Sequence, residues 1–133
     1  LTKRGGGTLT LTGNLSQGSV QIDGGTLALS GTNTFTGGIT VAGGTLRLAS
    51  NGAAGGATGV IRTTGSVIDY ANGVNMATPI VLNSSTTQLQ VLSGSATQSG
   101  VISEIGGARP LEKIGAGNLR LTAANTYSGL TTV

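Results

Sequence analysis

The sequence predicts an all-β protein that folds as a right-handed parallel β-helix, a solenoid of roughly six or seven coils. A Gly-Gly corner followed by a Thr-Leu-x-Leu strand recurs along the chain, and Gly7, Gly25 and Gly44 lie 18 and 19 residues apart. Apolar and polar residues alternate in the strands that follow these corners. The 133 residues include 25 Gly but only three aromatic residues. So few large side chains suit a thin core repeated along an axis better than one compact core.

The clearest strands are expected within residues 1–49. Five pairs of apolar residues are each separated by a single residue there: Leu9 and Leu11, Val20 and Ile22, Leu27 and Leu29, Ile39 and Val41, and Leu46 and Leu48. A period of two places both members of a pair on one face of a strand. We expect one set of leucines to point inward and stack from coil to coil: Leu9, Leu11, Leu27, Leu29, Leu46 and Leu48. Between them, Thr10, Ala28 and Arg47 are expected to point outward.

The segments between the strands are rich in Gly, Asn, Thr and Ser, residue types that let the chain turn. Residues 13–18 and 31–38 are predicted to form such corners, with Asn33 bonding the backbone and Phe35 covering the core. Residues 50–59 lack a large apolar side chain and predict an excursion loop between two coils. No window shows the apolar spacing of an amphipathic helix, so almost no helix is expected.

The repeat is less regular after residue 59, although strand-like segments continue. They lie at 60–61, 66–70, 79–82, 88–92 and 101–102. Near the end of the chain the opening pattern returns, because residues 111–122 align with residues 1–12 at a shift of 110. A short repeat therefore lies inside a longer one.

A second alignment supports the longer repeat. Residues 125–133 match residues 33–41, so that Asn125 and Tyr127 are equivalent to the asparagine and the aromatic residue of the first copy. We therefore predict that residues 1–133 are one β-helix segment and part of a longer repeat array.

Short, evenly spaced strands could also form the hairpins of an antiparallel sandwich or barrel. Hairpins make consecutive strands run in opposite directions. A motif that returns in the same order and phase is better satisfied by coils that superimpose, which gives parallel ladders. The β-helix is therefore preferred to the sandwich or barrel.

The charge pattern argues against several classes of partner. Only 8% of the residues are charged, and the net charge of +3 gives a pI of about 10.0 because few groups titrate. The basic residues are scattered and have no aromatic residues between them, so nucleic-acid binding is not expected. The absence of cysteine removes disulfides and thiol chemistry, and no apolar run approaches the roughly 20 residues of a membrane helix.

The sequence offers little for catalysis. Its carboxylates are Asp23, Asp69, Glu104 and Glu112, which are far apart and form no Asp-x-Asp pair for Ca²⁺. Asp69 near Arg62 is the nearest approach to the carboxylates and base of polysaccharide lyases, which share the β-helix fold, but an ordinary solvated ion pair is strongly preferred as the explanation. Without histidine there is no Ser-His couple. We therefore assign no catalytic, cofactor-binding or metal-binding residue, expect no cofactor, and predict that the protein is not an enzyme.

An outward threonine array could bind ice or a polysaccharide. Thr8, Thr10 and Thr12 begin such an array. Ala28 and Arg47 interrupt it in the following coils, so the array is not expected to extend along the solenoid.

With the corner, the strand and the Asn-Thr-(Phe/Tyr)-(Thr/Ser)-Gly turn established, the chain resembles the passenger domain of a Gram-negative autotransporter. More narrowly it resembles the autotransporter-associated β-strand repeat, seen here in residues 111–133. The resemblance implies an exported, extracellular cell-surface protein with a non-enzymatic structural or adhesive β-helical stalk, joined in the full-length protein to a carboxy-terminal outer-membrane β-barrel. The alternative is a carbohydrate-binding or polysaccharide-cleaving β-helix protein. The resemblance does not identify a host-surface or glycan receptor.

The two ends of the chain lie inside repeats, and we expect it to be a piece of something longer. A β-helix cut through its stack exposes unpaired backbone groups and a slice of core. Homotypic head-to-tail association through these open coil ends, at Leu1 and Val133, is therefore expected.

Overall fold

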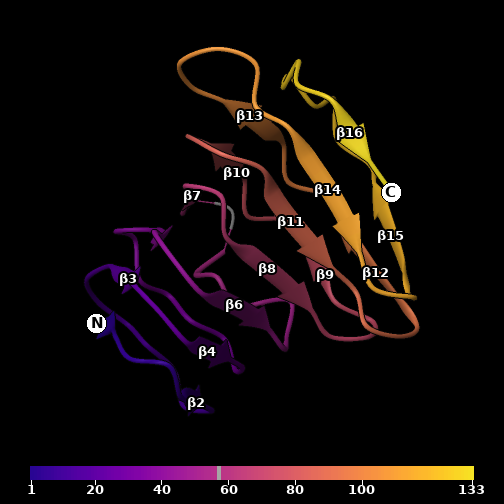
Figure 1. Ribbon diagram of the computed structural model, residues 1–133. Helices are drawn as coiled ribbons and strands as arrows, with labels where there is room; N and C mark the ends of the chain where they lie inside the picture. Colours follow the sequence, from indigo (N-terminus) through magenta and orange to yellow (C-terminus); the bar gives the residue numbers. More distant parts are fainter. Residues whose placement is uncertain (57) are drawn as a thin grey trace.

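The computed structural model describes residues 1–56 and 58–133, and these residues form sixteen β-strands and no helix (Figure 1). Residue 57 belongs to the excursion loop predicted for 50–59 and lies outside the described residues. Successive coils lie side by side from the N-terminus at one end of the molecule to the C-terminal strands at the other (Figure 1).

The strands of the described residues form three sheets that run along the solenoid. Sheet A contains, in spatial order, β1 (Thr2–Lys3), β3 (Val20–Ile22), β5 (Ile39–Val41), β7 (Ile61–Thr63), β10 (Ile80–Leu82) and β13 (Ile102–Glu104). Sheet B contains β2 (Thr8–Leu11), β4 (Thr26–Leu29), β6 (Thr45–Leu48), β8 (Val67–Tyr70), β11 (Thr87–Gln90), β14 (Leu111–Ile114) and β16 (Thr131–Thr132). Sheet C contains β9 (Asn75–Met76), β12 (Ser95–Gln98) and β15 (Asn118–Leu121).

Every strand pairing among these residues is parallel, and each coil passes from sheet A to sheet B. Six strands in sheet A correspond to six coils. The predicted parallel β-helix is confirmed, and the antiparallel sandwich or barrel is wrong. A motif repeated in phase gives superimposed coils because each strand then meets its own counterpart in the next coil.

The predicted leucine stack forms the inner face of sheet B. Leu27 lies opposite Leu46 and Leu29 opposite Leu48, and all four side chains are fully buried. Leu9 and Leu11 continue the two ladders in the first coil and pack against the core, but they are only half-buried there because a coil lies on one side of them alone. The apolar residues that alternate in the sequence therefore build one continuous core.

The outward positions also follow the prediction. Thr10 is exposed and Arg47 is half-exposed. Ala28 lies between them in the ladder and is only 8% exposed, because its single methyl group is shielded by the longer neighbours on either side.

The glycine corners bring neighbouring coils closer together than a side chain allows. Gly44 has a φ of 78°, in the left-handed region, and a Cβ placed there would lie 2.9 Å from the Gly24 carbonyl carbon. Glycine is required at this corner for its backbone conformation and for its lack of a side chain. The Gly-Gly pair in the repeat therefore allows the backbones of neighbouring coils to lie close together.

The two copies of the long repeat occupy different faces of the solenoid. Residues 1–12 contribute β1 to sheet A and β2 to sheet B, whereas residues 111–122 contribute β14 to sheet B and β15 to sheet C. Among the described residues, the fourth to sixth coils carry a third strand and the first three coils do not. The second copy of the motif is therefore displaced by one face of the solenoid relative to the first copy.

Candidate functional surface

The four carboxylates predicted as the only candidates for acid chemistry are dispersed, and each bonds to a neighbouring coil. Asp23 accepts hydrogen bonds from Gln21 Nε2 at 2.7 Å and from Arg4 Nε at 3.1 Å. The hydrogen bond from the Gln21 amide, followed by that from the Arg4 guanidinium, holds the pKa of Asp23 below its usual value. This carboxylate is therefore a surface link between the first and second coils.

Asp69 does not form the predicted pair with Arg62. It pairs with Arg47, which lies directly opposite it in the register of sheet B, whereas Arg62 belongs to sheet A. The pair is not solvated as expected, because Asp69 is only 5% exposed. Its Oδ1 atom has no hydrogen-bond partner among residues 1–56 and 58–133. The strand register thus overrides proximity in the sequence.

Glu104 fastens a later segment of the chain to the sixth coil. Its carboxylate accepts hydrogen bonds from the Ser128 hydroxyl at 2.6 Å, the Ser128 amide at 2.9 Å and the Arg109 amide at 2.7 Å. The Ser128 hydroxyl first, and then the Arg109 amide, lower the pKa of Glu104. The ionised carboxylate is the form that holds residue 128 in place.

Glu112 completes the set. Its Oε2 atom accepts a 2.7 Å hydrogen bond from Gln88 Nε2, and the two residues are opposite one another in the register of β11 and β14. Within the described part of the chain, no three histidine, cysteine or acidic side chains gather where a metal ion could be held. The carboxylates are thus brought to separate places, each with a partner from another coil.

The equivalent asparagines lie at corners, as expected, and connect coils. Asn33 Oδ1 accepts the Leu15 amide at 2.8 Å, and Asn33 Nδ2 donates to the Ala53 carbonyl at 2.7 Å. Asn125 Oδ1 accepts the Ile102 amide at 2.8 Å. Three further asparagines, missed by sequence reasoning, also connect coils, but they accept backbone amides of the following coil instead of the preceding one: Asn14, Asn51 and Asn72.

The equivalent aromatic residues cover the core to different extents. Phe35 is fully buried, whereas Tyr127 is half-buried against the core and its hydroxyl lies 2.9 Å from Thr131 Oγ1. Both therefore act as apolar covers, and the tyrosine keeps its polar end at the surface.

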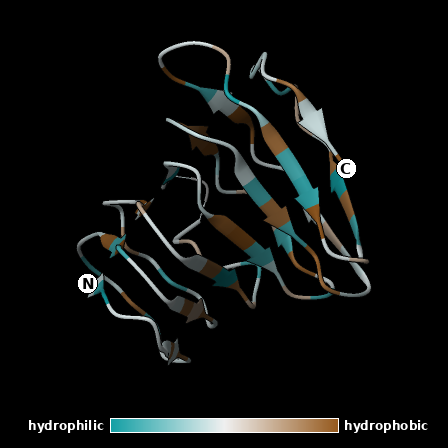
Figure 2. Ribbon diagram, viewed as in Figure 1, coloured by the Kyte–Doolittle hydropathy of each residue, from teal (hydrophilic) through white to brown (hydrophobic). Residues whose placement is uncertain are grey.

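Among the described residues, sheet B has the most strands, seven, and its outer face is a candidate binding surface. Inward apolar residues alternate with outward positions that are mostly polar, although Val67 and Ile114 also lie there, and Figure 2 shows hydrophilic and hydrophobic segments along the same arrows of this sheet. Its outward positions carry Thr26 and Thr45, the pair Arg47 and Asp69, and the pair Gln88 and Glu112. This face offers hydrogen-bonding groups at the spacing of a parallel sheet, which suits recognition of an extended partner.

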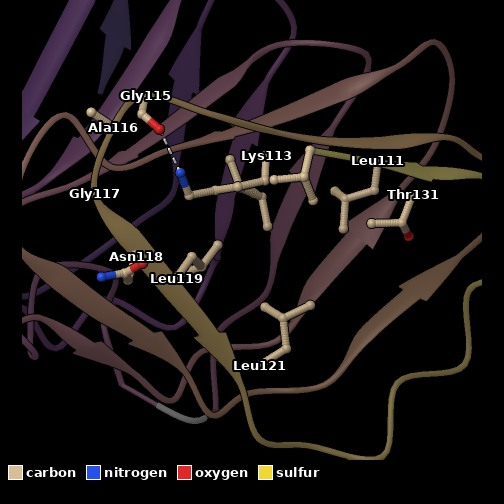
Figure 3. A pocket seen from close by; sticks show the side chains of 11 residues that line it. Leu111, Lys113, Gly115, Ala116, Gly117, Asn118, Leu119, Leu121 and Thr131 are labelled. Carbon is tan, nitrogen blue, oxygen red and sulfur yellow. Dashed lines mark hydrogen bonds between the residues drawn. The ribbon is translucent and has the colours of Figure 1, made fainter.

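A cavity opens at the C-terminal end of the coil stack. Its volume is about 390 Å³, and its lining includes Leu111, Lys113, Leu119, Leu121 and Val133 (Figure 3). The Lys113 ammonium turns back to the glycine corner and donates to the Gly115 carbonyl at 2.9 Å (Figure 3). The cavity is therefore apolar with a single cationic group at its wall.

Among the described residues, none belongs to a helix with the length and apolar character needed to cross a membrane. No solved structure matches the chain. The Adhesin BmaC autotransporter of Brucella suis biovar 1 (strain 1330) is 31% identical over 140 residues, an alignment that covers 95% of this chain and 4% of that protein. The chain thus spans a small part of the length of the curated relative it matches.

The family comparison agrees with the repeats found in the structure. The model of the passenger-associated-transport-repeat matches residues 1–29, 20–48 and 111–133, which together make up more than half of the chain. These are the coils with the Gly-Gly corner and the returning motif near the end. The chain belongs to the passenger-associated-transport-repeat family and is a repeat segment of an autotransporter passenger, exported to the bacterial cell surface.

Proposed function

We propose that this segment is a non-enzymatic, elongated part of the passenger, which we call the shaft. The shaft contributes to adhesion by holding a binding surface away from the cell. A single observation supports the proposal: every carboxylate of the chain is engaged in a bond between coils. The four contacts are Asp23 with Arg4, Asp69 with Arg47, Glu104 with Ser128, and Glu112 with Gln88. An acid-base enzyme would direct its carboxylates at a substrate. In this chain the carboxylates instead join one coil to the next.

The name of the matched relative supports the adhesive half of the proposal. That protein is described as an adhesin. In this chain the outer face of sheet B would supply the contact, since its threonine, glutamine and charged side chains point away from the core at regular spacing. A host-surface molecule or a glycan is the class of receptor that such a polar face fits.

The proposal extends to the complete protein. We infer that residues 1–133 are one segment of a longer array and that the passenger is joined to a carboxy-terminal outer-membrane β-barrel. Contact between copies through the coil ends belongs to the same proposal, and the exposed apolar side chains of Leu1, Leu130 and Val133 support it.

The shaft proposal is tested by removing one coil in register. Deleting residues 20–38 joins residue 19 to Ile39, which is the register partner of Val20, so the stack should close again. Deleting residues 20–28 removes about half a coil and leaves the leucine ladder out of register. The first variant should retain cooperative unfolding and display at the cell surface, and the second should lose both.

Adhesion and catalysis are separated by two assays on the same chain. Beads coated with the intact chain or the 20–38 deletion should bind cells to a similar extent, and beads coated with the 20–28 deletion should not. Incubation with uronate-containing polysaccharides should release no products. Product release that disappears in Asp69→Asn would instead establish a polysaccharide-cleaving enzyme and overturn the proposal.

A further inference from the structure

Two lysines lie directly opposite buried apolar residues of the neighbouring coil. Lys3 of β1 lies opposite Ile22, and Lys113 of β14 lies opposite Leu89. Ile22 and Leu89 are buried in the core. An ammonium group at such a position needs oxygen acceptors to replace water. Both lysines find these acceptors at the corner that follows their own strand.

Lys3 shows the complete arrangement. Its Nζ atom donates to the carbonyls of Arg4 at 2.8 Å, Gly5 at 2.7 Å and Gly24 at 3.1 Å, and the residue is 7% exposed. An ammonium group has three hydrogens to donate, so all of them are used. Two acceptors belong to the corner of the first coil, and the third belongs to the corner of the second coil. Lys3 therefore joins two consecutive corners.

Lys113 shows the same arrangement with one acceptor fewer. Its Nζ atom donates to the carbonyls of Ile114 and Gly115, both at 2.9 Å, which are the next two residues as for Lys3. Gly5 and Gly115 have matching φ angles of 75° and 82°. The hydrogen bonds of the described residues include no third acceptor for Lys113. Its side chain lines the 390 Å³ cavity, beside Leu119 and Leu121 (Figure 3).

We propose that Lys113 and this cavity form a docking site for the Gly-Gly corner of a further coil that continues from β16. The register fixes where the missing acceptor comes from. Because Thr131 and Thr132 pair with Leu111 and Glu112, the next position places Val133 over Lys113, as Ile22 lies over Lys3. Gly24 is the second residue after Ile22. The acceptor for Lys113 is therefore the carbonyl of the second residue after Val133.

The site demands glycine at the third residue as well. Gly25 has a φ of 66°, and a Cβ there would collide with the carbonyl oxygens of Gly5 and Gly7 and would lie 2.6 Å from Lys3 Nζ, so no side chain fits that corner. The same geometry at Lys113 excludes any residue but glycine there. The leucines that follow such a corner would lie over Leu119 and Leu121 and fill the cavity, as Leu27 and Leu29 cover the first coil.

The internal repeat supplies a sequence with this chemistry. Residues 125–133 match residues 33–41, and residues 42–48, Ala-Gly-Gly-Thr-Leu-Arg-Leu, follow them. A copy of residues 42–48 added after Val133 should thus form the corner and the strand of the next coil. This inference rests on the proposed continuation of the repeat array and does not depend on whether the shaft is adhesive.

The experiment compares four chains by thermal unfolding. They are the 133-residue chain and the chain extended by a copy of residues 42–48, each with Lys113 and with Lys113→Met, which retains an apolar stem of similar length. The extension should raise Tm by at least about 3 °C in the Lys113 background. In the Lys113→Met background the gain should fall by at least half. An equal gain in both backgrounds would overturn the proposal.

A matched control leaves the original 133 residues untouched. The extended chain carries Ala in place of the glycine copied from Gly44, a position with positive φ where a Cβ would meet backbone atoms of the preceding corner, and this single methyl should cancel the gain in Tm. In ¹⁵N spectra of the lysine ammonium groups, the extension should slow proton exchange at Lys113 to the rate of Lys3. Unchanged exchange at Lys113 would assign the cavity differently and overturn the proposal.

Discussion

The hydroxyl of Tyr70 donates a 3.0 Å hydrogen bond to Gln98 Oε1 inside the core and so joins sheet B to sheet C. The Gln98 amide continues the network, because its Nε2 atom donates to the carbonyls of Thr78 at 2.9 Å and Gly100 at 3.0 Å. Gln98 is fully buried and Tyr70 is 1% exposed. The third face of the solenoid is thus fixed to the second by hydrogen bonds as well as by apolar packing.

Tyr70→Phe should destabilise the protein by about 1–3 kcal/mol, since it leaves Gln98 Oε1 buried without its donor. Urea unfolding monitored by circular dichroism measures the change. Tyr127→Phe is the matched control, because the hydroxyl of Tyr127 bonds Thr131 at the surface and its loss should change stability by about 0.5 kcal/mol or less. Equal losses of stability in both variants would show that the buried hydrogen bond contributes no more than the surface one.

Tyr70 also predicts the behaviour of the protein in alkali. Burial raises the pKa of Tyr70 far above its ordinary value of 10.0, so the unfolded chain loses this proton at lower pH than the folded chain. The stability that the protonated Tyr70 contributes is fully present below pH 10 and is lost as the pH rises above that value. Unfolding midpoints measured from pH 8 to pH 11.5 should fall more steeply for the natural chain than for Tyr70→Phe.

Arg47→Ala should cost more than an ordinary surface substitution, although its side chain is 39% exposed. Removal of the guanidinium leaves the carboxylate of Asp69 nearly buried without its counter-ion, and about 1–2 kcal/mol of stability should be lost. Adding Asp69→Asn removes the uncompensated charge and should recover part of the loss. Additive effects in this double-mutant cycle would contradict the coupling.

The leucine ladder predicts a gradient of stability along the coils. Leu46→Ala creates a cavity in a fully buried site and should cost about 2–5 kcal/mol. Leu9→Ala should cost roughly half as much, because Leu9 is half-buried in the first coil. The two free energies of unfolding come from chemical denaturation at one pH. A larger loss for Leu9 than for Leu46 would contradict the predicted gradient.

Glu104 predicts a local opening in acid. Its pKa is lowered in the folded protein by the Ser128 hydroxyl and the Arg109 amide, so the contacts contribute above the ordinary carboxyl value of 4.5 and are lost as the pH falls below it. Hydrogen exchange at the Ser128 amide, corrected for its intrinsic pH dependence, should therefore lose protection between about pH 5 and pH 3. In Glu104→Gln the protection should be low at every pH.

The repeat strands could be predicted because their chemistry is local. Alternate leucines after a Gly-Gly corner determine both the strand and its inward face, as Leu46 and Leu48 show. The strand Ser95–Gln98 escaped prediction because its inward residues are Ala96 and Gln98, of which one is small and the other polar. Gln98 is accommodated in the core only because Tyr70 and two backbone carbonyls meet it there, and these partners are distant in the sequence.

Charge pairing was harder to predict than the fold for a related reason. Asp69 lies seven residues from Arg62 in the sequence, yet the chain turns a corner between them and places them in different sheets. Arg47, one coil earlier, stands opposite Asp69 because the coil between them is 22 residues long. The length of each coil decides which charges meet, and coil length varies along this chain where loops are inserted.

The displacement of the repeat from sheets A and B to sheets B and C has a consequence for anything that grips the shaft. Equivalent side chains of residues 1–12 and 111–122 lie on different faces of the solenoid, so the identical motifs do not form a straight line along its axis. A filamentous ligand that touched both copies would have to follow a helical path around the shaft. A flat receptor would meet one copy at a time, and turning the shaft would exchange one for the other.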